Sequence, residues 1–162
     1  MMSAAKYKCP ISKTELHLTS DGLVSKDGVK WPLHKGIIPN FLSIDSVDGA
    51  DKESLEWYKI NAVNYDAYLP LTFETFNVDE DEERMKMIKA LDLEPGQRVL
   101  EIGAGTGRDT ERILSRLGSG EIFVQDISTE ILDICYDKLS GTYEAIDKHF
   151  FISSLQNISP LT

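Results

Sequence analysis

The residues with the most chemical potential lie in one short stretch, VLEIGAGTGRDT at 99–110. Three glycines, Gly103, Gly105 and Gly107, separate an apolar run from the start of a predicted helix. A glycine-rich turn between a strand and a helix lets the backbone come close to a ligand at the positive end of the helix. The glycines alone do not decide between a phosphate, a dinucleotide and a ligand without phosphate.

The spacing of the glycines differs from two common phosphate-binding patterns. A P-loop needs a lysine directly after its last glycine, whereas the first basic residue here is Arg108. The dinucleotide fingerprint G-x-G-x-x-G would place its third glycine one residue later than Gly107. We therefore expect no Walker NTPase, and we keep an NAD-dependent oxidoreductase only as an alternative.

Two carboxylates give the predicted site its charge. Glu101 lies inside the first predicted strand, two residues before Gly103, where it would repel a pyrophosphate and attract an amino group or a sulfonium. Asp126 ends the next predicted strand, 25 residues beyond Glu101. A carboxylate at that place can accept hydrogen bonds from two ribose hydroxyls. The pattern favours a nucleoside that carries positive charge.

These residues resemble two motifs of the class I S-adenosylmethionine-dependent methyltransferases. The stretch VLEIGAGTGR resembles motif I, FVQDI at 123–127 resembles motif II, and the resemblance covers about residues 80–160. It implies S-adenosyl-L-methionine as the cofactor, with its ribose held by Asp126 and its adenine packed on Ile127. It names no catalytic residue. The cofactor-binding residues that it implies are Glu101, Gly103, Ala104, Gly105, Thr106, Gly107, Asp126 and Ile127.

Some of these residues also have a purely structural interpretation. A tight turn alone could explain the glycines, and core packing could explain Ile127. Thr106 suits a hydrogen bond to the cofactor and one within the loop equally well. Arg108 and Asp109 are expected to be first-turn residues of a helix and not ligand contacts.

Strands alternate with helices through the second half of the chain, 79–162. This order predicts an α/β fold with a Rossmann-like parallel sheet of about three strands and crossover helices. Three strands would leave an apolar sheet edge without a partner. We therefore expect either a fragment or isoform of a longer protein, or a partner chain that completes the sheet. The predicted strands are 98–103, 121–127 and 148–153, and the predicted helices start at Asp79 and cover 108–117 and 128–139.

Residues 1–42 predict a small module of β-hairpins with Asp-Gly turns. The segments YKCPISKTEL and WPLHKGIIP resemble the Trm112-like zinc module, which often precedes or partners a methyltransferase. Ser12 stands where that module has its second thiolate, so we predict no metal site. Cys9 and Cys135 are expected to be buried. We expect Trp31 and Phe41 to hold the module together and to pack it on the α/β domain. Its last stretch, GIIPNFL, should carry no regular element because of Gly36 and Pro39.

Residues 43–78 are predicted to connect the two parts. The acidic stretch 43–53 is interpreted as a linker, followed by a helix and an irregular aromatic segment that ends at Pro70. Tyr58, Tyr65 and Asp66 could cover the predicted site, as such segments do in the methyltransferase family, or could serve packing between the parts.

The composition of the chain limits the kinds of partner that we expect it to bind. The net charge is −10, which argues against binding nucleic acid through its phosphates and favours a small-molecule or protein methyl acceptor. The N-terminal residues lack the apolar region of a signal peptide, no stretch is long enough to span a membrane, and two cysteines cannot build a disulfide framework. We expect a cytoplasmic protein. A non-catalytic S-adenosylmethionine-binding or scaffold protein is the alternative to an enzyme.

Overall fold

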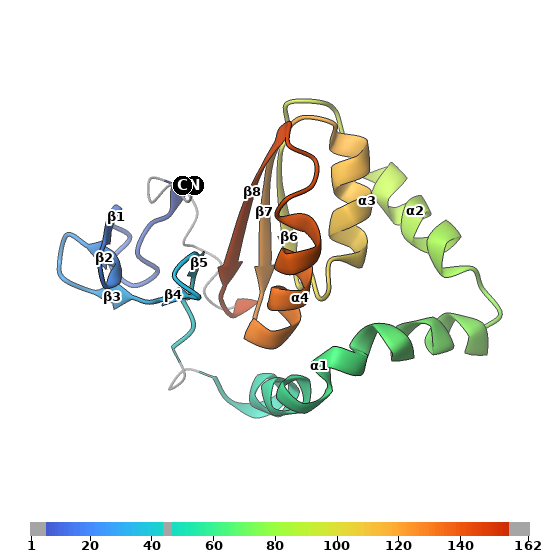
Figure 1. Cartoon of the computed structure of the whole chain (residues 1–162), viewed down its shortest axis with the longest axis horizontal. Helices are drawn as coiled ribbons and strands as arrows, with labels where there is room; N and C mark the ends of the chain where they lie inside the picture. The colour runs from blue at the N-terminus through green and yellow to red at the C-terminus, as the bar shows by residue number, and fades with distance from the viewer. Residues whose placement is uncertain (1–5, 44–46, 156–162) are drawn as a thin grey trace.

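The second half of the chain forms a three-stranded parallel sheet in the order β6-β7-β8, as Figure 1 shows. The computed structural model describes residues 6–43 and 47–155. Two helices connect the strands and lie on the same face of the sheet, which confirms the predicted α/β class with a Rossmann-like arrangement. The elements are β6 (Arg98–Ile102), α3 (Arg108–Leu117), β7 (Gly120–Asp126), α4 (Thr129–Leu139) and β8 (Ile146–Ile152).

The two crossover helices bury one apolar face each against the sheet. From α3 the buried side chains include Ile113, Leu114 and Leu117, and from α4 they include Leu132 and Cys135. Together with Ile122, Val124 and Ile152 of the sheet they make the main core. The burial of these apolar side chains is the dominant stabilising contribution to this part of the fold.

Strand β6 has a neighbour on one side only within the described residues. Leu100 and Ile102 are 38% and 44% exposed, although both are apolar strand residues. The prediction of a sheet edge without a partner therefore agrees with the described part of the chain. No helix in that part is both long enough and apolar enough to cross a membrane.

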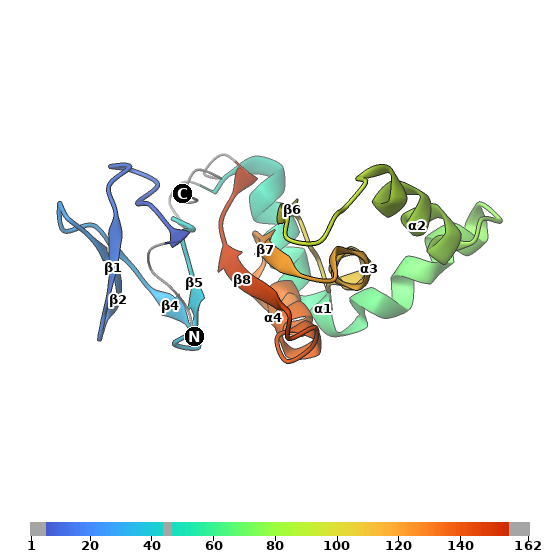
Figure 2. The ribbon, with the colours of Figure 1, turned by 90° about the horizontal axis from the view of Figure 1, so that it is seen from above.

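Residues 16–39 form two small antiparallel sheets, shown at the left of Figure 2. One has the order β1-β2-β3, and the other pairs β4 with β5. The prediction that Gly36 and Pro39 prevent a regular element is wrong. Pro39 has no N–H, but its carbonyl side remains available, so it can sit in a short strand at a sheet edge. The strands are β1 (Leu16–Thr19), β2 (Gly22–Ser25), β3 (Lys30–Trp31), β4 (Leu33–His34) and β5 (Ile38–Pro39).

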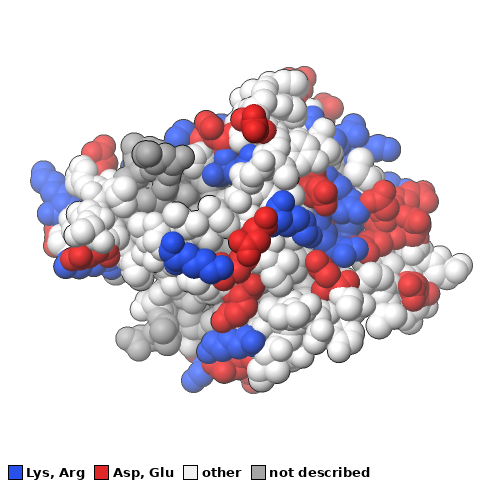
Figure 3. Space-filling view, in the orientation of Figure 1, with Lys and Arg blue, Asp and Glu red and all other residues white. Residues whose placement is uncertain are grey.

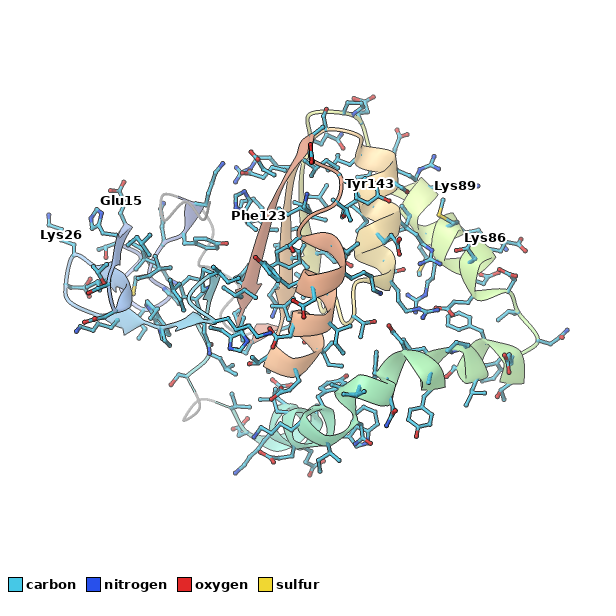
Figure 4. All side chains as sticks on the ribbon, viewed as in Figure 1. Glu15, Lys26, Lys86, Lys89, Phe123 and Tyr143 are labelled. Atoms are coloured by element: carbon cyan, nitrogen blue, oxygen red, sulfur yellow. The ribbon has the colours of Figure 1, made fainter. Side chains whose placement is uncertain are left out.

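An aromatic cluster joins this module to the second face of the parallel sheet. Phe41 lies 5.6 Å from Trp31, 5.5 Å from Tyr7 and 6.3 Å from Phe151, measured between ring centroids. Phe123 belongs to the same cluster, and Figure 4 labels it on the side of the sheet that faces the module. The Phe41 N–H also donates to the Ile152 carbonyl at 2.8 Å. The predicted role of Trp31 and Phe41 is thus confirmed.

Between the two parts runs a helix longer than predicted. Helix α1 (Gly49–Thr75) continues through Pro70, where the sequence predicted an end. Proline removes one backbone hydrogen bond, but the next turn continues, and the Phe76 N–H donates to the Thr72 carbonyl. The predicted linker 43–53 is therefore helical from Gly49 onward, and its residues 44–46 lie outside the described residues.

Helix α2 (Glu80–Ala90) begins where the sequence predicted. The Asp79 carboxylate accepts a hydrogen bond from the Glu82 N–H at 2.8 Å, which satisfies one of the free donors of the first turn. In Figure 2 α2 lies at the opposite end of the molecule from β1 and β2. It packs beside α3, and ion pairs across this contact are described with the site below.

Candidate functional site

The carboxyl ends of β6 and β7 lie side by side and hold the glycine loop. The Gly105 N–H donates to Asp126 Oδ2 at 2.8 Å, and the Gly103 N–H donates to Gln125 Oε1 at 3.2 Å. Both glycines have a positive φ, 68° for Gly103 and 59° for Gly105, and a Cβ on either would meet no atom within 4 Å. Their exposed face is therefore open to a ligand, while their N–H groups are fixed from behind.

Asp126 organises this corner of the sheet. Its second carboxylate oxygen, Oδ1, accepts the N–H of Ser128 at 2.9 Å, and the Ser128 hydroxyl in turn caps α4 by accepting the Ile131 N–H at 3.3 Å. Burial raises the pKa of Asp126, and hydrogen bonds from backbone N–H groups, including those of Ser128 and Gly105, oppose that rise. Asp126 therefore has a structural role at the start of α4, and it also lines the cavity described below.

Glu101 has a buried side-chain oxygen without a hydrogen-bond partner among the described residues, as Asp109 does. In Glu101 this atom is the carboxylate oxygen Oε2. Burial raises the pKa of Glu101 to about 7, the Thr110 hydroxyl lowers it, and the nearby charges of Asp109 and Asp126 raise it further. A buried acceptor without a partner is unfavourable by itself, so this oxygen is suited to a donor that comes from outside the chain.

A cavity of about 270 Å³ opens beside these residues. Four of the predicted residues line it, namely Gly103, Gly105, Asp126 and Ile127. No lysine or arginine side chain is among its lining residues, although two carboxylates are. The other lining residues, most of which the sequence reasoning missed, are Asp51, Ser54, Tyr58, Tyr65, Ile102, Gln125, Ile131 and Leu155.

Helix α1 forms one wall of this cavity. It supplies Tyr58 and Tyr65, whose rings lie 5.7 Å apart, and also Asp51 and Ser54. The prediction that Tyr58 and Tyr65 could cover the site agrees with this geometry. Figures 1 and 4 show α1 running below the lower ends of α3 and α4, on the side where the glycine loop lies. Asp51 and Ser54 could not be found from the sequence, because they reach the site only through the docking of α1.

A smaller cavity of about 90 Å³ lies on the other side of Tyr65. It shares Tyr65, Gly103 and Gly105 with the larger cavity, and Ala104 and Thr106 line it too. In contrast to the larger cavity, it includes two arginine side chains in its wall, Arg84 and Arg108. The predicted loop residues other than Gly107 therefore lie around two adjacent cavities, whereas Glu101 lines neither of them.

Gly107 points away from both cavities. A Cβ at this position would lie 2.6 Å from Cys135 Sγ and 2.9 Å from Leu139 Cδ1. Its φ of 85° is also unfavourable for other residues. Close packing of α4 against the start of α3 thus explains Gly107, in agreement with the structural interpretation of this glycine. Cys135 is buried there, as predicted.

Ion pairs between α2 and α3 fix the outer wall of the smaller cavity. Arg108 donates to both oxygens of Glu80 at 2.7 and 2.6 Å, and Arg84 bridges Glu80 at 2.7 Å and Asp109 at 2.6 Å. The prediction that Arg108 and Asp109 belong to the first turn of a helix is confirmed. Figure 3 shows acidic and basic side chains interleaved on this part of the surface.

A larger cavity, with a volume of about 480 Å³, lies elsewhere, at the amino end of β8. It contains none of the predicted site residues. Its lysine, Lys148, donates to the carbonyls of Thr142, Tyr143 and Ile146. Size alone is therefore a poor guide to the functional site here. Within residues 6–43 and 47–155, no cluster of three or more His, Cys, Asp or Glu side chains is arranged to hold a metal ion.

Comparison with known proteins gives partial likenesses. No protein-family model matches the chain, and no curated protein matches it. A solved DhpI–SAH complex is 17% identical with a TM-score of 0.46, and covers 61% of this chain and 43% of its own. A methyltransferase from Thiobacillus denitrificans, dependent on S-adenosylmethionine and bound to S-adenosyl-L-homocysteine, is 24% identical with a TM-score of 0.36, covering 44% and 29%. The 23S rRNA methyltransferase ErmE is 23% identical with a TM-score of 0.37, covering 43% and 28%.

The chain spans less than half the length of each of these three structures. The fold assignment rests on the chain's own strand order and crossover helices.

Proposed function

We propose that this chain binds S-adenosyl-L-methionine and acts as a methyltransferase, whose methyl acceptor is a small molecule or a protein. The observation that carries the proposal is the buried, unpartnered Oε2 of Glu101, a residue that comes two positions before an open glycine loop. An acceptor without a partner at that place favours a ligand that brings a positively charged donor. The absence of lysine and arginine from the lining of the larger cavity disfavours a pyrophosphate, and with it NAD.

Five of the predicted residues fit a part of that ligand. Glu101 would accept hydrogen bonds from the amino group of the methionine part, beside Gly103 and Gly105. Each carboxylate oxygen of Asp126 accepts one backbone N–H and retains capacity for a further hydrogen bond, so it would accept from a ribose hydroxyl. Ile127 would pack on the adenine. Gly107 contributes by letting α4 pack closely under the loop.

The bound cofactor supplies an electrophilic methyl group on a sulfonium sulfur. The chain's own residues bind and orient it, and the tyrosines of α1 restrict the access of water. The net charge of −10 is the reason to favour a small-molecule or protein acceptor over nucleic acid. A partner that supplies further strands at the free edge of β6 is part of the proposal, because Leu100 and Ile102 are exposed there.

Calorimetric titration with S-adenosylhomocysteine and with NAD tests this function. We expect the wild-type chain to bind the former and not the latter. Glu101→Gln and Asp126→Ala should each weaken binding about tenfold or more, because each removes charge-assisted hydrogen bonds. Gly105→Val should abolish it, since its φ of 59° is unfavourable for valine and its side chain would enter the space for the ligand.

Asp147→Asn is the matched control for charge. Asp147 is exposed and is the second residue of β8, at the opposite end of the sheet from the loop. The Asp147→Asn variant should bind S-adenosylhomocysteine with the affinity of the wild type. Equal affinity of the wild type for NAD, or unchanged binding of S-adenosylhomocysteine by both carboxylate variants, would overturn the proposed function.

A further inference from the structure

Helix α1 is held against the rest of the molecule by few apolar contacts. It has 27 residues, all of them described, and Ala62 is its one buried residue. Apolar residues of its outer side are largely in water, with Ile60 80% and Val63 89% exposed. A helix docked in this way gains little from the hydrophobic effect, so its position depends on polar contacts.

Asp66 makes most of those polar contacts. Its Oδ1 accepts a hydrogen bond from the Thr106 hydroxyl in the glycine loop at 2.5 Å. The same oxygen lies 3.7 Å from Arg108 of α3, and Oδ2 lies 3.8 Å from Lys138 of α4. One carboxylate thereby ties α1 to the loop and to both crossover helices.

The position of Asp66 also fixes the tyrosines at the site. Tyr65 precedes it directly and lines both cavities around Gly103 and Gly105, and Tyr58 lies two turns earlier on the same wall. Further along the helix, the ring of Phe73 lies 5.4 Å from the guanidinium of Arg84 on α2. Release of Asp66 would therefore uncover the loop while the far end of α1 stays attached.

We propose that Asp66 and Thr106 form a latch that closes α1 over the glycine loop, and that release of the latch admits and discharges the ligand. Asp66 is a positioning residue in this scheme, because it acts on the ligand through Tyr58, Tyr65 and the loop. The statement about the ligand depends on the proposed function above, whereas the latch itself depends only on contacts within the chain. The Thr106 hydroxyl is accordingly assigned to the latch and not to the cofactor.

Hydrogen exchange of the unliganded protein tests the latch directly. Asp66→Ala and Thr106→Val should each speed exchange in the first two thirds of α1 about tenfold, since a hydrogen bond to a charged group contributes about that factor to an equilibrium. The double variant should show little more than Asp66→Ala alone, because that change already removes the hydrogen bond that Thr106→Val removes. Exchange in β7 and α4 should stay unchanged, which also shows that each variant is folded.

Glu56→Ala is the matched control. It removes a carboxylate from the same helix, but the lysine that Glu56 pairs with at 2.7 Å is Lys59 of α1 itself. It should leave exchange in α1 within about twofold of the wild type. Unchanged exchange in Asp66→Ala would overturn the latch, as would strictly additive effects in the double variant or an equal acceleration throughout the sheet.

Titration with S-adenosylhomocysteine separates the latch from the proposed function. We expect affinity to fall about tenfold in Asp66→Ala and to be retained in Glu56→Ala. If the wild type does not bind this nucleoside, the proposed function fails, and the exchange experiment still decides the latch. If the wild type binds it and Asp66→Ala binds equally well, the ligand-admitting role of the latch is refuted.

Discussion

Gly107 and Cys135 lie so close together that no side chain can be added between them. A Cβ on Gly107 would lie 2.6 Å from the Cys135 sulfur, well inside van der Waals contact. The contact joins the first residues of α3 to the middle of α4, and both helices begin at the ligand-facing edge of the sheet. The glycine that ends the predicted loop is thus explained by helix packing and not by a ligand.

Gly107→Ala should destabilise the protein by about 2–4 kcal/mol, from backbone strain at positive φ together with overpacking. Gly28→Ala is the matched control, because Gly28 has the same φ of 85° and open space around its Cβ. It should cost only about 1–2 kcal/mol. Urea denaturation measures both. Adding Cys135→Ala to Gly107→Ala should restore part of the loss, and equal effects of the two glycine substitutions would disprove the packing explanation.

The raised pKa of Glu101 predicts that the stability of the protein falls as pH rises. Its pKa of about 7 in the folded chain lies above its ordinary value of 4.5, so the folded state binds the proton more tightly than the unfolded state. The contribution of protonated Glu101 to folding stability is therefore fully present below about pH 4.5 and is lost as pH rises through 7. Glutamine does not ionise, so Glu101→Gln does not lose stability in this way as pH rises. Near pH 8 the variant should be more stable than the wild type by up to roughly 3 kcal/mol.

The measurement is denaturant unfolding of both proteins between pH 5 and 8. The stability gap between Glu101→Gln and the wild type should widen steadily as pH rises. A constant gap over this range would contradict the elevated pKa. Binding of S-adenosylhomocysteine to the wild type should strengthen over the same interval, because the ionised carboxylate attracts the ligand's amino group.

Phe41 should be essential for docking of the N-terminal module. Phe41→Ala removes a fully buried ring that contacts Tyr7, Trp31 and Phe151, and should destabilise the protein by about 3–5 kcal/mol. It should also shift the fluorescence of Trp31 toward that of exposed tryptophan. Phe76→Ala is the control, since that ring is 73% exposed and should change stability by less than about 1 kcal/mol. Similar stabilities of the two variants would show that the module does not depend on the aromatic cluster.

Local patterns predicted the strands and helices of the second half closely. The helix over 108–117 matches α3 at both ends. The helices predicted to start at Asp79 and at Ser128 begin there, each capped by the side chain of that residue. These elements are determined by alternation of apolar residues and by caps within a few residues. The prediction failed at Pro70, because the rule that proline ends a helix describes a local preference that a single lost hydrogen bond cannot enforce.

The candidate site could be predicted only in part. Glu101, the loop and Asp126 follow from one strand–helix order. The structure brings the loop and Asp126 together at one cavity, whereas Glu101 is not among the residues that line it. Their binding of a cofactor stays a prediction. The wall supplied by Asp51 and Ser54 depends on the way α1 crosses the ends of the strands, which no local pattern encodes. His149 is a similar case, because its stacking on Phe123 and its 3.0 Å contact with Glu121 arise from the register of β7 and β8.

The backbone bond from Phe41 to Ile152 has a consequence for anyone who shortens this chain. Asn40 pairs with Ile152 as a parallel bridge, so the segment after β5 continues the large sheet. A truncation that starts at α1 would strip a covering layer from Phe123 and Phe151 and leave the outer side of β8 bare. Such a surface invites self-association, so a soluble shortened form should keep the hairpins.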